Sequence, residues 1–211
     1  MQKLEQLFKN NIEWSEQIKA EDPQFFERLA EQQTPEYLWI GCADSRVPAN
    51  ELVGLLPGDL FVHRNIANCV IQTDLNCQSV IYYAVQVLKV KHILVTGHYG
   101  CGGVQAAMGN ASAGIVDHWI ACIRDLYAQK REQIDLLDDP TQRLNRLCEL
   151  NVVQQVTNVA HSPAVQLAWE QGQKLIIHGL IYDIGDGVLH KVTDPVSSIK
   201  QVAKEFRVSQ L

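Results

Sequence analysis

The chain has 211 residues, of which 24 are acidic and 18 are basic, so its net charge is -6. This length is enough for one sizeable hydrophobic core and short for two full domains, so we expect a single domain over residues 1–211. The acidic balance argues against a nucleic acid or an anionic membrane surface as partner. No uninterrupted apolar stretch approaches the roughly 20 residues that a membrane-spanning helix needs. Six cysteines are scattered through predicted helices and strands in a chain without an export signal, which indicates a reducing compartment, and we expect the cytoplasm.

Residues 1–34 predict a helical arm. Apolar side chains recur at helical spacing, at Leu4, Leu7, Phe8 and Ile12. The segment precedes the first predicted strand and has no place in a sheet. We therefore expect it to pack on a partner subunit.

Apolar runs predict buried strands at residues 37–40, 60–64 and 93–96. Between the last two, Asp74 is placed to cap a helix whose apolar stripe reaches Leu88. Strands that alternate with helices are typical of a parallel sheet.

The second half of the chain predicts covering helices over residues 115–130 and 141–171, the latter broken at residues 162–163 by a Ser-Pro pair. A short terminal helix is predicted over residues 197–206.

One further strand is predicted over residues 174–183. The sequence Ile-Gly-Asp-Gly at residues 184–187 has the chemistry of a hairpin turn, which leads into residues 188–192. We expect these last residues to form an antiparallel edge strand.

Two short clusters carry the chemistry: Cys-Ala-Asp-Ser-Arg at residues 42–46 and His-Tyr-Gly-Cys-Gly-Gly at residues 98–103. Together they supply two thiols, an imidazole and a carboxylate, the ligand types that a tetrahedral Zn²⁺ ion favours. Each cluster directly follows a predicted buried strand, and sites in open parallel sheets form beyond the carboxyl ends of strands.

The spacing within each cluster favours one shared ion. Cys42 and Asp44 lie two apart, so an extended chain points both side chains the same way. His98 and Cys101 lie three apart in a glycine-rich turn, which lets the two side chains converge. A lone histidine or cysteine is more often structural, but the combination predicts a zinc site.

The runs Cys-Ala-Asp-Ser-Arg-Val at residues 42–47 and Gly-His-Tyr-Gly-Cys-Gly-Gly at residues 97–103 resemble the two signatures of the β-class carbonic anhydrases. The resemblance covers almost the whole chain, because residues 61–65, the helix around Tyr83 and residues 178–183 fall in the family's order. It implies an α/β fold with a mainly parallel central sheet, flanked by helices, and an antiparallel edge strand. It also implies dimers that pair again into tetramers.

By this resemblance, Cys42, His98 and Cys101 hold one Zn²⁺ ion per chain. Three protein ligands leave a fourth position for water, and zinc-bound hydroxide would attack carbon dioxide to give bicarbonate and a proton. Two thiolates place more negative charge on the metal than three imidazoles would. We therefore expect the activity to favour alkaline conditions.

Asp44 has two incompatible roles open to it: it can ligate the zinc ion, or it can accept a hydrogen bond from zinc-bound hydroxide. A bidentate pair with Arg46 would hold the carboxylate off the metal. In the family that the chain resembles, this aspartate and arginine form the catalytic dyad. An ordinary ion pair without a catalytic role is the alternative.

For the substrate, the resemblance implies contacts from Gln33 and the backbone of Gly102, with Phe61, Ile66 and Tyr83 from a neighbouring subunit lining the cleft. Carbon dioxide is small and apolar, so it needs a dry pocket more than a binding motif. Ordinary core packing explains the two aromatic residues and Ile66 equally well.

Trp39, Arg64 and Tyr182 match a triad that marks the bicarbonate-regulated, type II subtype of the family. An arginine with a tyrosine hydroxyl and an indole N–H makes a reasonable anion cage. Bicarbonate held there would favour a closed form in which Asp44 ligates zinc and water is excluded, an allosteric inhibition by population shift. The alternatives are core positions for the two aromatic residues and a structural ion pair for the arginine.

Three rival interpretations stay open at this point. One is a hydrolase of carbon disulfide or carbonyl sulfide on the same scaffold. The second is a non-catalytic zinc module closed by Asp44 as fourth ligand, against which Arg46 argues. The third, a nucleotide-binding loop at residues 97–103, lacks both the G-x-G-x-x-G spacing and a Walker lysine.

Overall fold

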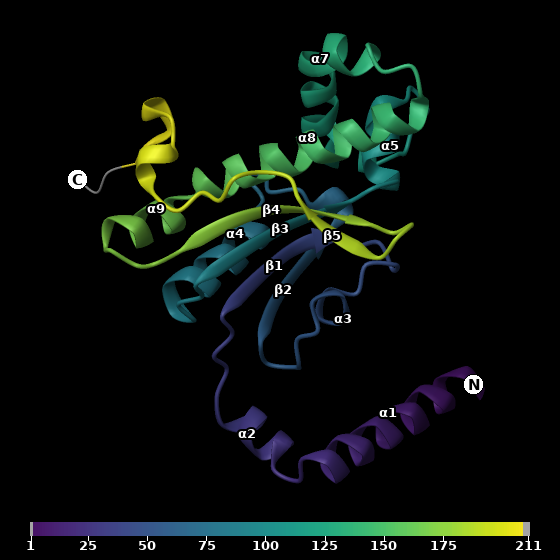
Figure 1. Ribbon diagram of the computed structural model, residues 1–211, viewed down its shortest axis with the longest axis vertical. Coiled ribbons are helices and arrows are strands. Elements are labelled where there is room, and N and C mark those ends of the chain that lie inside the picture. The colour runs from purple at the N-terminus through teal and green to yellow at the C-terminus, as the bar shows by residue number, and fades with distance from the viewer. Residues whose placement is uncertain (1, 209–211) are drawn as a thin grey trace. The chain divides into compact units, whose positions relative to one another are not determined.

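The computed structural model describes residues 2–208 and divides the chain into two units, residues 1–34 and residues 35–211 (Figure 1). The first unit consists of helices α1 (Gln2–Glu21) and α2 (Phe25–Glu31). The helices predicted for this segment are therefore confirmed.

Aromatic contacts hold the two helices of the first unit together. The ring of Trp14 on α1 meets that of Phe26 on α2 edge to face, with 5.6 Å between centroids, and Lys19 lies over the same phenylalanine. Other apolar side chains of α1 are exposed: Leu4, Leu7, Phe8 and Ile12.

A five-stranded sheet in the order β2-β1-β3-β4-β5 forms the centre of the second unit (Figure 1). The first four strands run parallel, and the last pairs antiparallel with β4. The predicted mainly parallel α/β sheet with an antiparallel edge strand is confirmed. The strands are β1 (Tyr37–Cys42), β2 (Leu60–Asn65), β3 (His92–His98), β4 (Ile176–Asp183) and β5 (Val188–Lys191).

Helices flank this sheet. In chain order they are α3 (Ala49–Val53), α4 (Leu75–Tyr82), a π-helical turn η2 (Tyr83–Val87), α5 (Gly102–Met108), α6 (Val116–Trp119), α7 (Ala121–Asp135), α8 (Pro140–Ala160) and α9 (Pro163–Glu170). Asp74 caps α4 as predicted, because its carboxylate accepts the N–H groups of Asn76 and Cys77.

The main core lies between the sheet and helices α4, α8 and α9. Leu38, Ile93 and Ile177 from three neighbouring strands are fully buried there. The opposite face buries Trp39 with residues of α3. Because both faces of the sheet are covered, successive residues of its central strands are apolar. This continuous apolar pattern made the strands predictable from the sequence.

Two helix predictions were wrong in detail. Residues 197–206 form no α-helix but two 3₁₀ turns, Ile199–Gln201 and Lys204–Phe206, because Val202 between them is extended and buried in the core. The helix predicted over residues 115–130 breaks at Ile120, which is fully buried where α6 gives way to α7.

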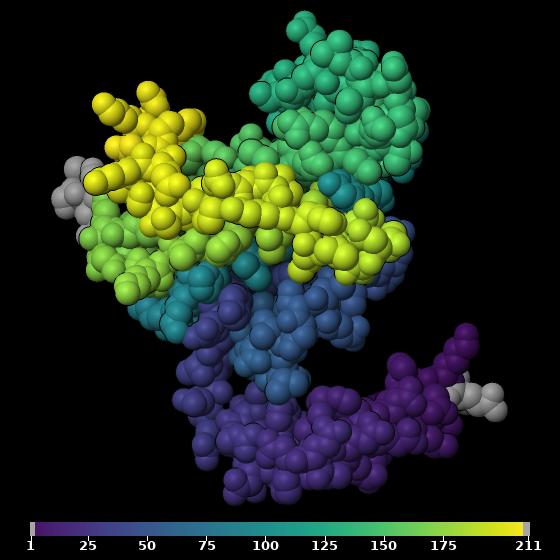
Figure 2. Space-filling view, viewed as in Figure 1, coloured from purple at the N-terminus to yellow at the C-terminus, as the bar shows by residue number. Residues whose placement is uncertain are grey.

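After β5 the chain runs back beside β4. The backbone N–H of Val192 donates to Gly179, and Val196 forms a bridge with Ile177. Figure 2 shows this segment as a yellow band on the surface. Among the described residues, no helix combines the length and apolar character needed to cross a bilayer.

Candidate metal centre

Three potential metal ligands meet at the carboxyl ends of two neighbouring strands. Cys42 ends β1, His98 ends β3, and Cys101 immediately precedes α5. The two sulfur atoms lie 3.9 Å apart, and the ligand atoms of all three residues lie within 4.8 Å of one another. All three side chains are buried. The convergence expected from the spacing is therefore present.

Glycines shape the turn between His98 and Cys101. Gly100 adopts a positive φ of 66°, which glycine accommodates without strain. A Cβ atom at Gly103 would lie 2.8 Å from Cγ2 of Ile66, so only glycine fits at this close approach. The turn can therefore bring the cysteine back toward the histidine.

The imidazole of His98 is oriented for metal binding. Its Nδ1 donates to the carbonyl of Tyr99 at 3.0 Å, which leaves the lone pair on Nε2. That Nε2 is buried and has no hydrogen-bond partner among residues 2–208. A buried nitrogen without a partner is costly unless it binds a ligand.

The donor set fits Zn²⁺. Tetrahedral zinc with Zn–S bonds of about 2.3 Å separates two thiolates by about 3.8 Å, close to the spacing of Cys42 and Cys101. Two thiols and one imidazole are also typical zinc ligands. We conclude that these residues can hold the ion without rearrangement of the sheet.

The pKa values of the two thiols shift in opposite directions. A hydrogen bond from Cys101 lowers the pKa of Cys42 to about 4, and the same bond raises the pKa of Cys101. Burial opposes protonation of His98, but contact with the Cys42 sulfur raises its pKa overall. Metal binding must displace the remaining protons, so the affinity for metal should rise with pH.

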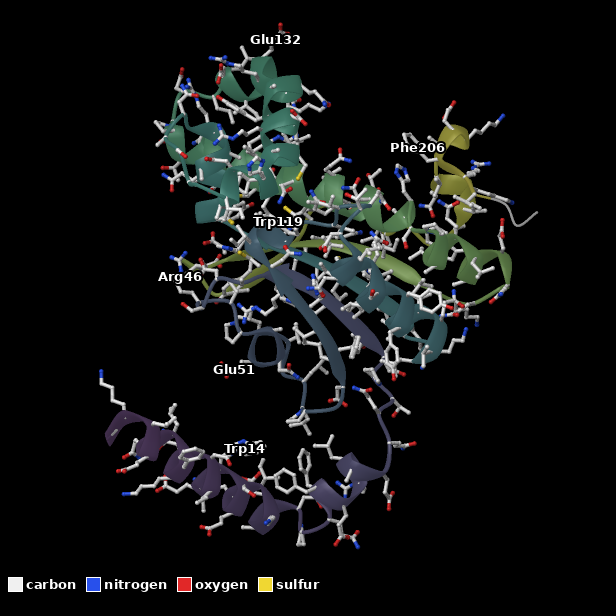
Figure 3. The ribbon with its side chains drawn as sticks, turned by 180° about the vertical axis from the view of Figure 1, so that it is seen from behind. Trp14, Arg46, Glu51, Trp119, Glu132 and Phe206 are labelled. Atoms are coloured by element: carbon white, nitrogen blue, oxygen red, sulfur yellow. The ribbon has the colours of Figure 1, made fainter. Side chains whose placement is uncertain are left out.

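Asp44 lies beside the ligands and forms a bidentate ion pair with Arg46. The guanidinium donates to both carboxylate oxygens, from Nε at 2.9 Å and from Nη2 at 2.7 Å, and the Arg46 backbone N–H adds a third bond. This contact holds the pKa of the Asp44 carboxyl well below its usual range. The carboxylate Oδ2 lies 3.7 Å from Nε2 of His98. Arg46 itself is exposed on the loop after β1 (Figure 3).

The residues expected around the substrate do not all gather at this centre. Gly102 follows Cys101 directly, and Ile66 packs against the neighbouring glycine. Phe61 and Tyr83 contact each other at 5.9 Å between ring centroids. Phe61 pairs with Leu38, which lies four residues before Cys42 on β1. Phe61 therefore lies away from the metal ligands of its own chain. Gln33 is exposed in the first unit.

Trp39, Arg64 and Tyr182 lie close to the loop that carries Asp44. Arg64 donates from Nε to the carbonyl of Cys42 at 2.9 Å and from Nη2 to the carbonyl of Asp44. Trp39 and Tyr182 pack in one apolar cluster, and the indole Nε1 is buried without a partner among the described residues. The contacts of Arg64 to backbone carbonyls had no signal in the sequence.

Sequence reasoning also missed a buried polar network on α8. Asn151 donates to the carbonyl of Ala67 at 2.9 Å and accepts from Gln155 at 2.8 Å. This network holds a turn in which Ala67 and Asn68 adopt positive φ angles of 60° and 48°. Two amides four residues apart on the apolar face of a helix were the available signal.

A second group of donors, His63, Asp74 and Cys77, also has its ligand atoms within 4.8 Å of one another. Asn65 donates to the imidazole of His63 at 3.1 Å, and Asp74 is occupied by capping α4. Packing and capping account for this group.

The chain is similar to known carbonic anhydrases. A family model described as carbonic anhydrase matches residues 37–189. A carbonic anhydrase of Emericella nidulans is 49% identical over 185 residues, which cover 88% of this chain and 81% of that protein. One of Candida albicans is 36% identical and covers 91% of this chain and 69% of that protein.

Solved structures agree. A structure of tetrameric β-carbonic anhydrases from Sordaria macrospora superposes with a TM-score of 0.89 at 37% identity and covers 93% of this chain and 100% of that one. A β-carbonic anhydrase of Aspergillus fumigatus gives a TM-score of 0.87 at 42% identity, covering 92% of this chain and 93% of that one. With its sheet and its Cys-His-Cys group, the chain is an enzyme of the β-class carbonic anhydrase family.

Proposed function

We propose that the chain catalyses the reversible hydration of carbon dioxide to bicarbonate and a proton, with one Zn²⁺ ion held by Cys42, His98 and Cys101. One observation carries this proposal: Nε2 of His98 is buried beside two cysteine sulfurs and has no hydrogen-bond partner within the described part of the chain. Zinc bound there would lower the pKa of water at its open position and so supply the nucleophile at moderate pH.

Asp44 and Arg46 form the proposed catalytic dyad. Because its pKa is held low, Asp44 stays ionised and can only accept hydrogen bonds, so it can orient the attacking water. Three hydrogen bonds from Arg46 fix the carboxylate in this position and keep it from ligating the metal.

The substrate cleft is proposed to form between two subunits. Gly102 and Gln33 would contact substrate, and Phe61, Ile66 and Tyr83 would line the cleft of a neighbouring chain. Ile66 and Tyr83 are exposed in the single chain, which supports a role at such a boundary.

We propose that the chain assembles as a homodimer that pairs into a tetramer, with residues 1–34 packing on the partner subunit. The exposed apolar side chains of α1 support this packing, because they need a cover in water. The Sordaria macrospora relatives are tetrameric. The free thiols of all six cysteines are compatible with the cytoplasm, which we propose as its location.

Inhibition by bicarbonate is a second proposal, and the contacts of Arg64 favour it. The guanidinium now holds the carbonyls of Cys42 and Asp44. If it turned to an anion between Trp39 and Tyr182, the loop carrying Asp44 would lose two hydrogen bonds and Asp44 could move onto the metal. We expect steep pH dependence and suppression by bicarbonate; Trp39→Phe should relieve both, and a variant with unchanged behaviour would rule this site out.

The test of the main proposal is stopped-flow hydration of carbon dioxide by zinc-quantified protein. Asp44→Asn keeps the shape of the side chain but removes its charge, so it should retain zinc and lose most of its activity. Hydrolysis of carbon disulfide and of carbonyl sulfide, measured in parallel, tests the rival hydrolase. If either compound were turned over faster than carbon dioxide, it would be the preferred substrate and the main proposal would fail.

A further inference from the structure

A tyrosine between two of the metal ligands is tied to a helix outside the metal centre. Tyr99 follows the ligand His98, and its hydroxyl donates to Oε1 of Glu149 on α8 at 2.8 Å. The other oxygen of this carboxylate accepts from Nη1 of Arg146 at 2.8 Å. The proposed hydration of carbon dioxide uses none of these three side chains.

The backbone of Tyr99 is in direct contact with His98. Its carbonyl accepts the hydrogen bond from Nδ1 of His98 at 3.0 Å, and its N–H donates to the carbonyl of Tyr182 on β4 at 3.0 Å. The carbonyl that orients the imidazole therefore belongs to a residue held by the sheet at its N–H and by α8 at its hydroxyl.

The turn that carries this carbonyl has little rigidity of its own. Residues 100, 102 and 103 are glycines, and Gly100 adopts a positive φ of 66°. Glycine has more conformational freedom than any other residue. The side chain of Tyr99 links this turn to α8, a long helix that packs against β3 and β4 (Figure 1). Because the carbonyl carbon is bonded to the Cα atom of Tyr99, a tether on the side chain also restrains the carbonyl.

The surroundings favour a strong tether. The ring of Tyr99 packs against an apolar cluster that includes Cys101 and Cys148, so its hydroxyl bond is partly shielded from water. A hydrogen bond to a carboxylate is stronger than one between neutral groups, and a lower local dielectric strengthens it further. Arg146 holds the second oxygen of Glu149, which fixes the carboxylate in place.

We propose, on the basis of the zinc site proposed above, that Glu149 and Tyr99 are positioning residues for the metal ligand His98. Glu149 holds Tyr99, and the carbonyl of Tyr99 holds Nδ1 of His98, so that Nε2 stays aimed at the metal position. Hydrogen bonds behind a ligand of this kind set how tightly a site binds its metal. Without the hydroxyl bond, the contact between Nδ1 and the carbonyl opens more often and zinc leaves sooner.

Cobalt(II), which takes similar nitrogen and sulfur ligands, gives a direct measure of this contact. As a paramagnetic ion, it shifts the ring N–H proton of a bound histidine far outside the ordinary range of proton NMR signals. Only one of the three proposed ligands is a histidine, so cobalt-loaded full-length protein should give one such signal, and His98→Ala should lack it. The rate at which this proton exchanges with water reports how often the bond from Nδ1 opens.

Tyr99→Phe removes the hydroxyl and keeps the ring. The shifted proton should exchange at least about tenfold faster than in the parent, as expected for the loss of one hydrogen bond to a charged group. Release of zinc to a chelator should also be about tenfold faster. The matched control is Tyr127→Phe, which removes a tyrosine hydroxyl that donates to Asp135 at 3.4 Å on α7. This variant should keep both rates of the parent.

Variants of Glu149 separate the hydrogen bond from the negative charge. Glu149→Leu should reproduce both effects of Tyr99→Phe, whereas Glu149→Gln, whose amide oxygen can still accept the hydroxyl, should restore most of the parent's behaviour. The double variant Tyr99→Phe/Glu149→Leu should be no worse than either single variant, because both changes remove the same bond.

Two results would contradict the proposal in different ways. Parent-like proton exchange and zinc release in Tyr99→Phe and Glu149→Leu, or equal acceleration in Tyr127→Phe, would overturn the positioning role and leave the proposed function standing. A parent protein that takes up neither zinc nor cobalt at His98 would overturn the proposed function as well.

Discussion

Replacing Asn151 by alanine should destabilise the protein strongly, although the residue touches no proposed ligand. The side chain is buried, donates to the carbonyl of Ala67 and accepts from the amide of Gln155. Alanine leaves the Nε2 group of Gln155 without its acceptor and leaves the carbonyl of Ala67 with only the weak thiol donor of Cys69 at 3.6 Å. At about 1–3 kcal/mol for each unsatisfied buried group, the loss amounts to about 2–6 kcal/mol, and water entering the vacated space reduces it to the lower half of that range.

The turn that Asn151 holds gives this loss a second consequence. Ala67 and Asn68 adopt left-handed backbone conformations, each of which costs of order 1–3 kcal/mol for a residue other than glycine. Without its anchor the turn can relax, and Ala67 packs against Gly103 beside the metal ligands. Zinc should therefore dissociate faster from Asn151→Ala than from the parent.

Urea unfolding of the zinc-loaded protein, combined with zinc release to a chromogenic chelator, measures both effects. Gln142→Ala is the matched control, because this exposed residue of the same helix should change the unfolding free energy by less than about 0.5 kcal/mol. If Asn151→Ala lowered the free energy of unfolding by less than about 1 kcal/mol, the turn would not depend on this hydrogen bond and the prediction would be wrong.

Three further predictions concern the site and the pH. Arg46→Met should reduce carbon dioxide hydration by about 100-fold or more at full zinc content, because the Asp44 carboxylate is no longer held in place to orient the attacking water. Arg131→Met, which breaks an exposed ion pair, should leave the rate unchanged, and equal rates in the two variants would remove Arg46 from the mechanism. Burial lowers the pKa of His161, so its neutral form favours the folded state and stability should fall as the pH drops through the ordinary histidine pKa of about 6.5. In zinc-free protein, the melting temperature of His161→Gln should fall less steeply with decreasing pH than that of the parent. Equal pH dependence in the two proteins would refute the role of His161. Removing zinc with a chelator should lower the melting temperature, and adding zinc should restore it. At a free zinc concentration 100 times the dissociation constant, zinc should raise the free energy of unfolding by about 2.7 kcal/mol. Cys101→Ser should abolish this response, and a variant that still responds to zinc would place the ion elsewhere.

The metal centre could be predicted because its information is local. Each ligand cluster follows an apolar run that is buried on both faces, and parallel neighbours bring their carboxyl ends together. Cys42 and His98 therefore meet once both strands are assigned, and the glycines around Cys101 allow the turn back.

What supports the centre was not predictable in the same way. Asn151 reaches Ala67 from 84 residues away, and Arg64 binds backbone carbonyls that any sequence would supply. The break at Ile120 and the extended Val202 arise because tertiary burial of one apolar side chain overrides local helix preference. Contacts of this kind depend on the assembled fold and leave little trace in local spacing.

The most direct test of the central claim compares carbon dioxide hydration with zinc content in the parent and in His98→Ala. We predict rapid hydration by parent protein that carries one zinc ion per chain, in proportion to the zinc bound, and loss of both zinc and activity in the variant. Full zinc occupancy without hydration in the parent, or undiminished hydration in His98→Ala, would contradict the account.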